Sequence, residues 1–192
     1  KNKIEFISTP FDKESIDLLL KLKVNKIKVA SSELNNFPFL KQVAKTKKEV
    51  ILSTGMGTLL EIEKAVKLLI NNGINRKKLT VLHCNTEYPT PFSDANLKAI
   101  NTIKKKIKVK VGYSDHTLGI EAPIAAVALG AQIIEKHFTL DKNMEGPDHS
   151  ASLEFEGLKD VIRGIKEINT ALGTDSKKIL SQGQMINKEN LS

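Results

Sequence analysis

Apolar, β-branched segments alternate with amphipathic helical segments along almost the whole chain, and this alternation limits the possible folds more than any other feature. Continuous β-branched strands that are each followed by a helix indicate a parallel sheet covered on both faces. The predicted strands span residues 4–9, 26–31, 49–54, 79–84, 108–114 and 132–139. The predicted helices span residues 12–23, 36–46, 58–72, 94–107, 119–129 and 154–172. The sequence therefore predicts an α/β protein built from six βα units.

Two architectures are compatible with repeated βα units, a (β/α)8 TIM barrel and a doubly wound open sheet. No glycine-rich dinucleotide fingerprint follows any strand, and polar residues close every strand rather than only those at one switch point. The length of each unit is also close to that of a barrel unit, so we predict a TIM barrel. Since six strands cannot close an eight-stranded barrel, we expect its first two βα units to be missing. Residues 1–173 would then be a partial barrel with strands three to eight, and the polar residues 174–192 a linker toward an absent segment.

Local signals place two of the helix boundaries. Thr58 and Glu61 have the spacing of a capping box at the start of one helix, and Gly73 can supply its left-handed C-cap. Pro38, shortly after Asn36, marks the start of another helix.

The composition argues against several classes of protein. No apolar run approaches the ~20 residues of a membrane-spanning helix, and no signal peptide precedes the first strand. The single cysteine, Cys84, excludes an internal disulfide, so we expect a reducing, cytoplasmic location. The net charge of +8 comes almost entirely from lysines without interleaved aromatic residues, which favours a solvated surface over a nucleic-acid-binding face. This excess positive charge can still attract an anionic substrate.

Two histidines stand at the ends of adjacent predicted strands. His116 and His137 each close an apolar run and open into a polar loop, where the active sites of TIM barrels are built. Two imidazoles that converge there can hold a divalent metal. His83 lies inside an apolar run and is interpreted as a core histidine, while His149, on a loop, is a weaker candidate.

The period-two alternation of strands assigns side chains to faces. It places Ser114 with His116 on one strand, and Glu135 with His137 on the next. Lys136 points away from the His137 face, which argues against a Schiff base at this lysine.

Small hydroxyl side chains follow most of the predicted strands. Thr9, Ser31, Ser53 and Ser114 stand at strand ends, where hydroxyls and helix N-termini can bind phosphate. Lys28 lies on the second strand and can supply the countercharge. This pattern predicts a phosphate-bearing ligand.

Six long motifs carry a resemblance to a known family. They are STPFDKES (8–15), KVASSELNNFPFL (28–40), ILSTGM (51–56), LHCNTEYPTPFSDANL (82–97), GYSDHTLG (112–119) and IIEKHFTLDKNMEGPDHSAS (133–152). Together they resemble the sialic acid synthase family, which includes the N-acetylneuraminate, legionaminate and pseudaminate synthases and the spore-coat polysaccharide synthases. The resemblance covers nearly the whole chain.

The resemblance implies a homodimer in which a TIM barrel is followed by a small antifreeze-like domain, absent from this chain. It also implies the condensation of phosphoenolpyruvate with an N-acetylated hexosamine aldehyde, with release of phosphate. The expected cofactor is Mn²⁺, with Mg²⁺ or Co²⁺ as possible substitutes. The acceptor would be N-acetylmannosamine or a related diacetamido sugar, and neither nucleic acid nor a membrane is an expected partner.

The residue roles that the resemblance implies fall into three groups. His116 and His137 would be the metal ligands and, with Glu33, the catalytic residues. Phosphoenolpyruvate would be held by Thr9, Lys28, Ser31, Ser53 and Ser114. The sugar would face Glu33, Tyr88 and Asp148. In this family an asparagine contacts phosphoenolpyruvate where this sequence has Thr86, so Thr86 is the expected substitute.

Three other functions remain open from the sequence. One is a metal-independent Schiff-base aldolase on the same barrel, with Lys28 or Lys136 as the reactive lysine. Another is a catalytically silent fragment or binding module, and the third is a nucleic-acid-binding protein. We expect this segment alone to be inactive, because two barrel units are missing.

Overall fold

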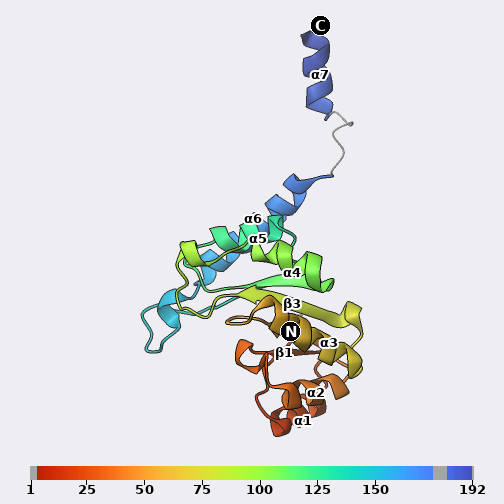
Figure 1. Ribbon diagram of the computed structural model, residues 1–192. Helices are drawn as coiled ribbons and strands as arrows, with labels where there is room; N and C mark the ends of the chain where they lie inside the picture. The colour runs from red at the N-terminus through yellow and green to blue at the C-terminus, as the bar shows by residue number, and fades with distance from the viewer. Residues whose placement is uncertain (1–3, 175–180, 192) are drawn as a thin grey trace.

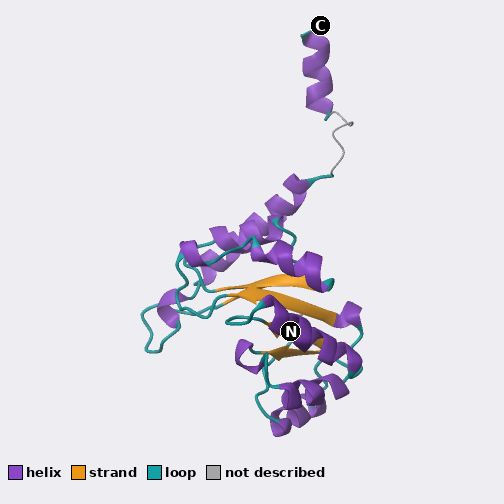
Figure 2. Cartoon of the chain, viewed as in Figure 1, coloured by secondary structure: helices purple, strands orange, loops and turns teal. Residues whose placement is uncertain are grey.

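A computed structural model describes residues 4–174 and 181–191 (Figures 1 and 2). Its strands are β1 (Lys26–Val29), β2 (Glu49–Ser53), β3 (Leu79–Cys84), β4 (Lys110–Asp115) and β5 (Ile134–Lys136). Its α-helices are α1 (Lys13–Lys21), α2 (Phe37–Lys45), α3 (Leu59–Asn71), α4 (Ala99–Ile107), α5 (Glu121–Ala128), α6 (Phe155–Leu172) and α7 (Gln182–Asn190).

The described strands form one parallel sheet in the order β1-β2-β3-β4-β5. The spatial order follows the chain order without a reversal, whereas a doubly wound sheet reverses at its switch point. The sheet curls into a half-barrel, with helices packed along its outer side (Figure 1). The α/β class is therefore confirmed, and the doubly wound alternative is wrong for these strands.

Residues 4–9 were predicted to form a strand, but they do not form one in the structure. It lies beside β1, where the Lys28 N–H donates to the Ser8 carbonyl oxygen at 3.3 Å. Glu5 adds side-chain contacts with Asn25 and Lys26. A strand requires a repeated ladder with a neighbour, which an apolar sequence pattern cannot supply by itself.

The predicted helix boundaries are confirmed where local capping decides them. The Thr58 hydroxyl and the Glu61 carboxylate form both halves of the capping box of α3. Gly73 has a φ of +113°, a left-handed conformation that a residue with a Cβ rarely adopts. Asn36 caps α2, with Pro38 in its first turn.

The two faces of the sheet have different roles. One face packs against α1 to α5 and forms the core, with these strand residues: Ile27, Val29, Val50, Leu52, Leu79, Val81, Val111 and Tyr113. Because side chains alternate along a strand, the other face of the half-barrel carries Lys28, Ser53 and Ser114. In the sheet register Ser114 lies opposite both Cys84 and Glu135. The fold therefore gathers polar side chains from different strands on its inner face.

The polar C-terminal region contains one helix that the linker prediction did not include. Residues 175–180 lie outside the described part of the chain. Helix α7 follows, with a capping box formed by Ser181 and Gln184, and all its residues are exposed. The sequence pattern is polar all round, so periodicity gave no signal for this helix. The role of residues 174–192 as a linker stays a prediction.

None of the helices in residues 4–174 and 181–191 combines the length and the hydropathy that crossing a membrane requires.

Gly112 lies in β4 at a position with no room for a side chain, so we expect even an added methyl group to destabilise the sheet. A Cβ there would lie 2.5 Å from the Ile133 carbonyl oxygen and 2.5 Å from a methyl group of Leu82. We expect Gly112→Ala to lower the free energy of unfolding by about 1–3 kcal/mol, as overpacking does. Gly183→Ala is the matched control, because an added Cβ meets nothing within 4 Å in α7. Thermal unfolding followed by circular dichroism measures both, and equal melting temperatures would contradict the prediction.

Candidate active site

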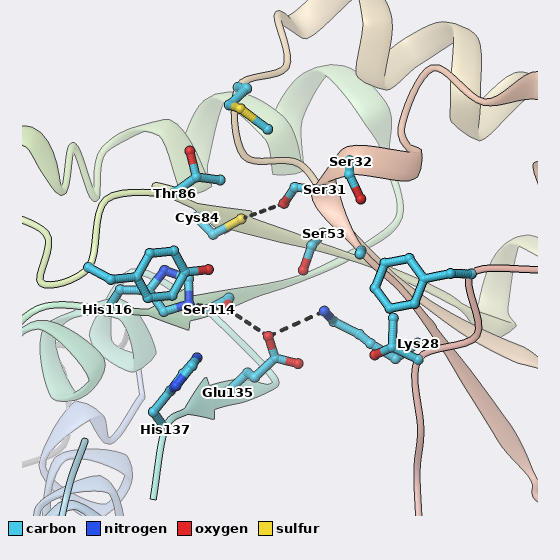
Figure 3. A pocket seen from close by; sticks show the side chains of 15 residues that line it. Lys28, Ser31, Ser32, Ser53, Cys84, Thr86, Ser114, His116, Glu135 and His137 are labelled. Atoms are coloured by element: carbon cyan, nitrogen blue, oxygen red, sulfur yellow. Dashed lines mark hydrogen bonds and ion pairs between the residues drawn. The ribbon is translucent and has the colours of Figure 1, made fainter. Parts of the chain in front are cut away.

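A cavity of about 510 Å³ opens at the carboxyl ends of the strands (Figure 3). It is lined by Thr9, Phe11, Lys28, Ala30, Ser31, Ser32, Ser53, Met56, Cys84, Thr86, Tyr88, Ser114, His116, Glu135 and His137. All the site residues predicted from the sequence are among them except Glu33 and Asp148. The fold thus brings into one cavity side chains that are distributed along most of the chain.

The two predicted histidines face each other across one side of the cavity (Figure 3). Their ring centroids are 5.3 Å apart. The Nδ1 atom of His116 lies 2.6 Å from the Asn85 carbonyl oxygen, so this nitrogen is the N–H donor and Nε2 is left as an acceptor. Burial lowers the pKa of His116, which favours the neutral ring. The Nδ1 atom of His137 lies 3.5 Å from an Asp148 carboxylate oxygen.

This arrangement fits a divalent metal ion. A neutral imidazole whose Nδ1–H is held by a carbonyl oxygen is a typical oriented metal ligand. Within the described part of the chain, no group of three or more His, Cys, Asp or Glu side chains gathers as a metal site. Two imidazoles alone leave the remaining coordination positions of an ion to water or substrate oxygens. A closed tetrahedral zinc site, by contrast, has four protein ligands.

The opposite side of the cavity has the character of an anion site. The Lys28 side chain is 12% exposed and extends into the cavity from β1 (Figure 3). Ser53 is buried, and its hydroxyl has no hydrogen-bond partner within the described structure. A buried hydroxyl without a partner is energetically costly, so a ligand oxygen is a suitable acceptor for it. Ser31 accepts a hydrogen bond from the Gly55 N–H at 2.9 Å, and its hydroxyl lies 3.3 Å from the Cys84 sulfur.

Glu135 lies between the two sides and was not among the predicted site residues. One of its oxygens is 3.3 Å from the Lys28 ammonium and accepts a hydrogen bond from Ser114 at 2.6 Å. The Ser114 hydroxyl in turn lies 3.5 Å from Nε2 of His116. Strand alternation had placed Glu135 on the same face as His137, and this could have identified it as a site residue. Alternation does not indicate which side chains Glu135 contacts.

Tyr88 forms an aromatic wall beside the histidines. Its ring centroid is 4.1 Å from that of His116 and 5.5 Å from that of His137. Burial raises the pKa of the Tyr88 phenol. Its half-exposed ring and hydroxyl can contact both the apolar and the polar parts of a sugar. Thr86, from the same loop, also lines the cavity.

The structure does not bring Glu33 and Asp148 into the lining. Glu33 ends a short 3-10 turn, and its carboxylate accepts a hydrogen bond from the Asn36 amide at 2.6 Å. Asp148 is half exposed, and its carboxylate contacts His137, which lines the cavity. Both lie at the margin of the cavity, next to lining residues.

The remaining candidate residues lie elsewhere, as predicted. His83 is a core histidine, with Nε2 2.9 Å from the Ala95 carbonyl oxygen, and burial lowers its pKa. His149 contacts the Thr139 hydroxyl at 2.7 Å in its loop. Lys136 points away from the cavity into a buried ion pair with Asp115. An ammonium held in this way is a poor candidate for Schiff-base formation.

Comparisons with known proteins identify the family of this chain. The NeuB family matches residues 1–177. The N,N'-diacetyllegionaminic acid synthase of Campylobacter jejuni is 55% identical over 178 residues, which are 93% of this chain and 53% of that protein. A pseudaminic acid synthase of the same species is 40% identical over 181 residues, 94% of this chain and 52% of that protein. The chain spans about half the length of these curated relatives.

A solved structure supports the same assignment. The N-acetylneuraminic acid synthetase of Leptospira borgpetersenii superposes with a TM-score of 0.89 at 36% identity, over 98% of this chain and 65% of that one. Sequence and fold thus agree, and the chain belongs to the NeuB family, the sialic acid synthase family.

Proposed function

We propose that the protein carrying this chain condenses phosphoenolpyruvate with an N-acetylated hexosamine aldehyde, such as N-acetylmannosamine or a diacetamido sugar, and releases phosphate. The observation that supports this most is the two-sided cavity, which places a lysine and strand-end hydroxyls opposite two oriented imidazoles. The relatives named as legionaminic and pseudaminic acid synthases support the same class of reaction.

The anion side would hold phosphoenolpyruvate. Lys28 offers a charge-assisted contact to a phosphate or carboxylate oxygen, and the hydroxyls of Thr9, Ser31, Ser53 and Ser114 offer hydrogen bonds. Glu135 keeps the Lys28 ammonium directed into the cavity. Thr86 would take part from the adjoining loop. Held in this way, the methylene carbon of phosphoenolpyruvate would attack the aldehyde carbon, and water would add before phosphate leaves.

His116 and His137 would hold Mn²⁺, with Mg²⁺ or Co²⁺ as alternatives. A divalent ion in such a site supplies polarisation of a carbonyl oxygen. The contribution of the chain itself is to orient the His116 ring through the Asn85 carbonyl oxygen and to favour its neutral form by burial, which lowers its pKa. Tyr88 would stack on the sugar. Glu33 and Asp148 would contact it from the margin, and Glu33 would handle a proton near the sugar.

The complete protein would add two βα units before this segment and an antifreeze-like domain after it, and it would act as a homodimer in the cytoplasm. The relatives are about twice as long as the part that this chain matches, which supports additional segments. A preceding strand could pair with residues 4–9, which already lie beside β1.

The test uses the full-length protein with Mn²⁺, phosphoenolpyruvate and N-acetylmannosamine or a diacetamido hexose. We expect release of inorganic phosphate that requires both substrates and stops when EDTA removes the metal. Phosphate release is followed by a colorimetric assay and the nine-carbon product by mass spectrometry. Turnover that resists EDTA, together with borohydride trapping of a substrate on Lys28, would instead support a Schiff-base aldolase.

For the 192-residue segment on its own we expect no turnover and a tendency to associate. β1 and β5 are the outer strands of the described sheet, and such edges expose backbone donors and acceptors. Size-exclusion chromatography with light scattering, together with the phosphate assay, measures both properties. A monodisperse, cooperatively unfolding monomer that turns over phosphoenolpyruvate would contradict the need for further barrel units.

A further inference from the structure

A second cluster of charged side chains lies behind the histidines, on the core-facing side of the same strand ends. Asp115 ends β4, Lys136 ends β5, and the two occupy paired positions in the sheet register. The Lys136 ammonium donates to the Asp115 carboxylate at 2.5 Å. The two side chains are 5% and 0% exposed, respectively. A buried ion pair thus joins the ends of these strands.

Thr117 completes the hydrogen bonding of this pair. One Asp115 oxygen accepts from the backbone N–H and the hydroxyl of Thr117, at 3.0 and 2.8 Å. The Lys136 ammonium also donates to the Thr117 carbonyl oxygen at 2.7 Å. Thr117 itself is fully buried. These contacts fix the backbone on both sides of His116.

The two histidines of the cavity are sequence neighbours of the residues in this network. His116 lies between Asp115 and Thr117, and His137 follows Lys136 along the chain. The position of His116 is restrained further by the 2.6 Å contact with the Asn85 carbonyl oxygen. His137 has a looser contact of 3.5 Å with a half-exposed carboxylate. The neighbours of the two histidines in the chain are thus joined by the buried ion pair.

A contribution to folding stability is a weak explanation for the burial of the Asp115 and Lys136 charges. Replacing both members of a buried ion pair by uncharged groups of similar volume is often neutral or stabilising, because the desolvation of both charges is avoided. Residues that orient metal ligands, by contrast, strongly affect the affinity for the metal.

We propose that Asp115 and Lys136 are positioning residues whose ion pair sets the separation and relative orientation of His116 and His137, and thereby the affinity of the site for a divalent cation. The inference rests on the proposed function, because it takes the two imidazoles as metal ligands.

The test measures Mn²⁺ binding and phosphoenolpyruvate binding separately, in the full-length protein without sugar. The double variant Asp115→Asn with Lys136→Met leaves the net charge unchanged, retains an oxygen for Thr117 and fills the volume of the lysine chain. We expect its dissociation constant for Mn²⁺, measured by electron paramagnetic resonance of the free ion, to rise about 10- to 100-fold. Calorimetry on the metal-free protein should show unchanged phosphoenolpyruvate binding, because the anion side is untouched.

Lys26→Met is the matched control, since it makes the same substitution in the more exposed ion pair with Glu5. It should leave both dissociation constants unchanged. If the double variant did not fold, Lys136→Arg alone replaces it, because it keeps the Asp115 charge paired and changes only the length and shape of the group that joins the two strand ends. The same selective loss of Mn²⁺ affinity is expected.

Two results would overturn this inference while leaving the proposed function in place. One is unaltered Mn²⁺ affinity in a folded variant, and the other is an equal loss of both affinities, which would mark a purely structural role. If the unaltered protein did not bind Mn²⁺, or if binding survived His116→Ala, the proposed function would fail and this inference with it.

Discussion

His116→Ala and His137→Ala should each abolish Mn²⁺ binding and phosphate release in the full-length protein, with little change in its melting temperature. The two rings lie 5.3 Å apart on the cavity wall and would be the metal's ligands from the protein. Residues that merely orient a ligand contribute about 10- to 100-fold to metal affinity, so the loss of a ligand should exceed that range. Equilibrium dialysis with metal analysis measures the binding.

The matched control for these variants is His83→Gln. His83 is a histidine on β3 that contacts the Ala95 carbonyl oxygen and does not line the cavity. It should keep the Mn²⁺ affinity of the unaltered protein. Unchanged metal content in both cavity variants would refute the assignment of the ligands.

Lys28→Ala should weaken phosphoenolpyruvate binding far more than sugar binding. The lost charge-assisted contact corresponds to roughly 1.5–3 kcal/mol, or about ten- to hundredfold in affinity. The structure adds a reason for the upper end, because Glu135 would then face the anion without its 3.3 Å partner. Isothermal titration with each ligand separately measures the difference.

Lys26→Ala controls for the loss of a positive charge from the same strand. Lys26 precedes Lys28 by two residues on β1, but it pairs with Glu5 outside the cavity. It should leave phosphoenolpyruvate binding unchanged. If Lys28→Ala weakened both ligands equally, Lys28 would be a structural residue rather than a phosphate contact.

Much of the fold was predictable because the signals that specify it are local. The capping box of Thr58 and Glu61 and the left-handed Gly73 place the ends of α3, and both are confirmed. Strand positions were predictable from β-branched runs for β1 to β5, although β5 is shorter than its apolar pattern. Residues 4–9 failed as a strand because strand formation depends on a neighbour, which no local pattern contains.

The cavity lining was predictable where strand ends carry distinctive side chains. His116, His137 and the strand-end hydroxyls line the cavity because the carboxyl ends of parallel strands meet at one edge. Glu33 was expected among them, but the 3-10 turn directs its carboxylate to Asn36 instead. The conformation of a turn after a strand is set by its surroundings, so sequence position alone does not decide where its side chain points.

The sequence by itself determined the order and type of the elements from α1 to α6, the parallel arrangement of β1 to β5 and the strand ends that carry the polar side chains. Hydrophobic periodicity, caps and strand alternation act over a few residues, and they can be recognised without knowing the fold. Only the tertiary structure decided that Glu135 lies between Lys28 and Ser114, and that Lys136 is buried against Asp115. These contacts depend on sheet register and on the curl of the half-barrel, which bring together residues that are far apart in the chain and carry no local mark of their partners.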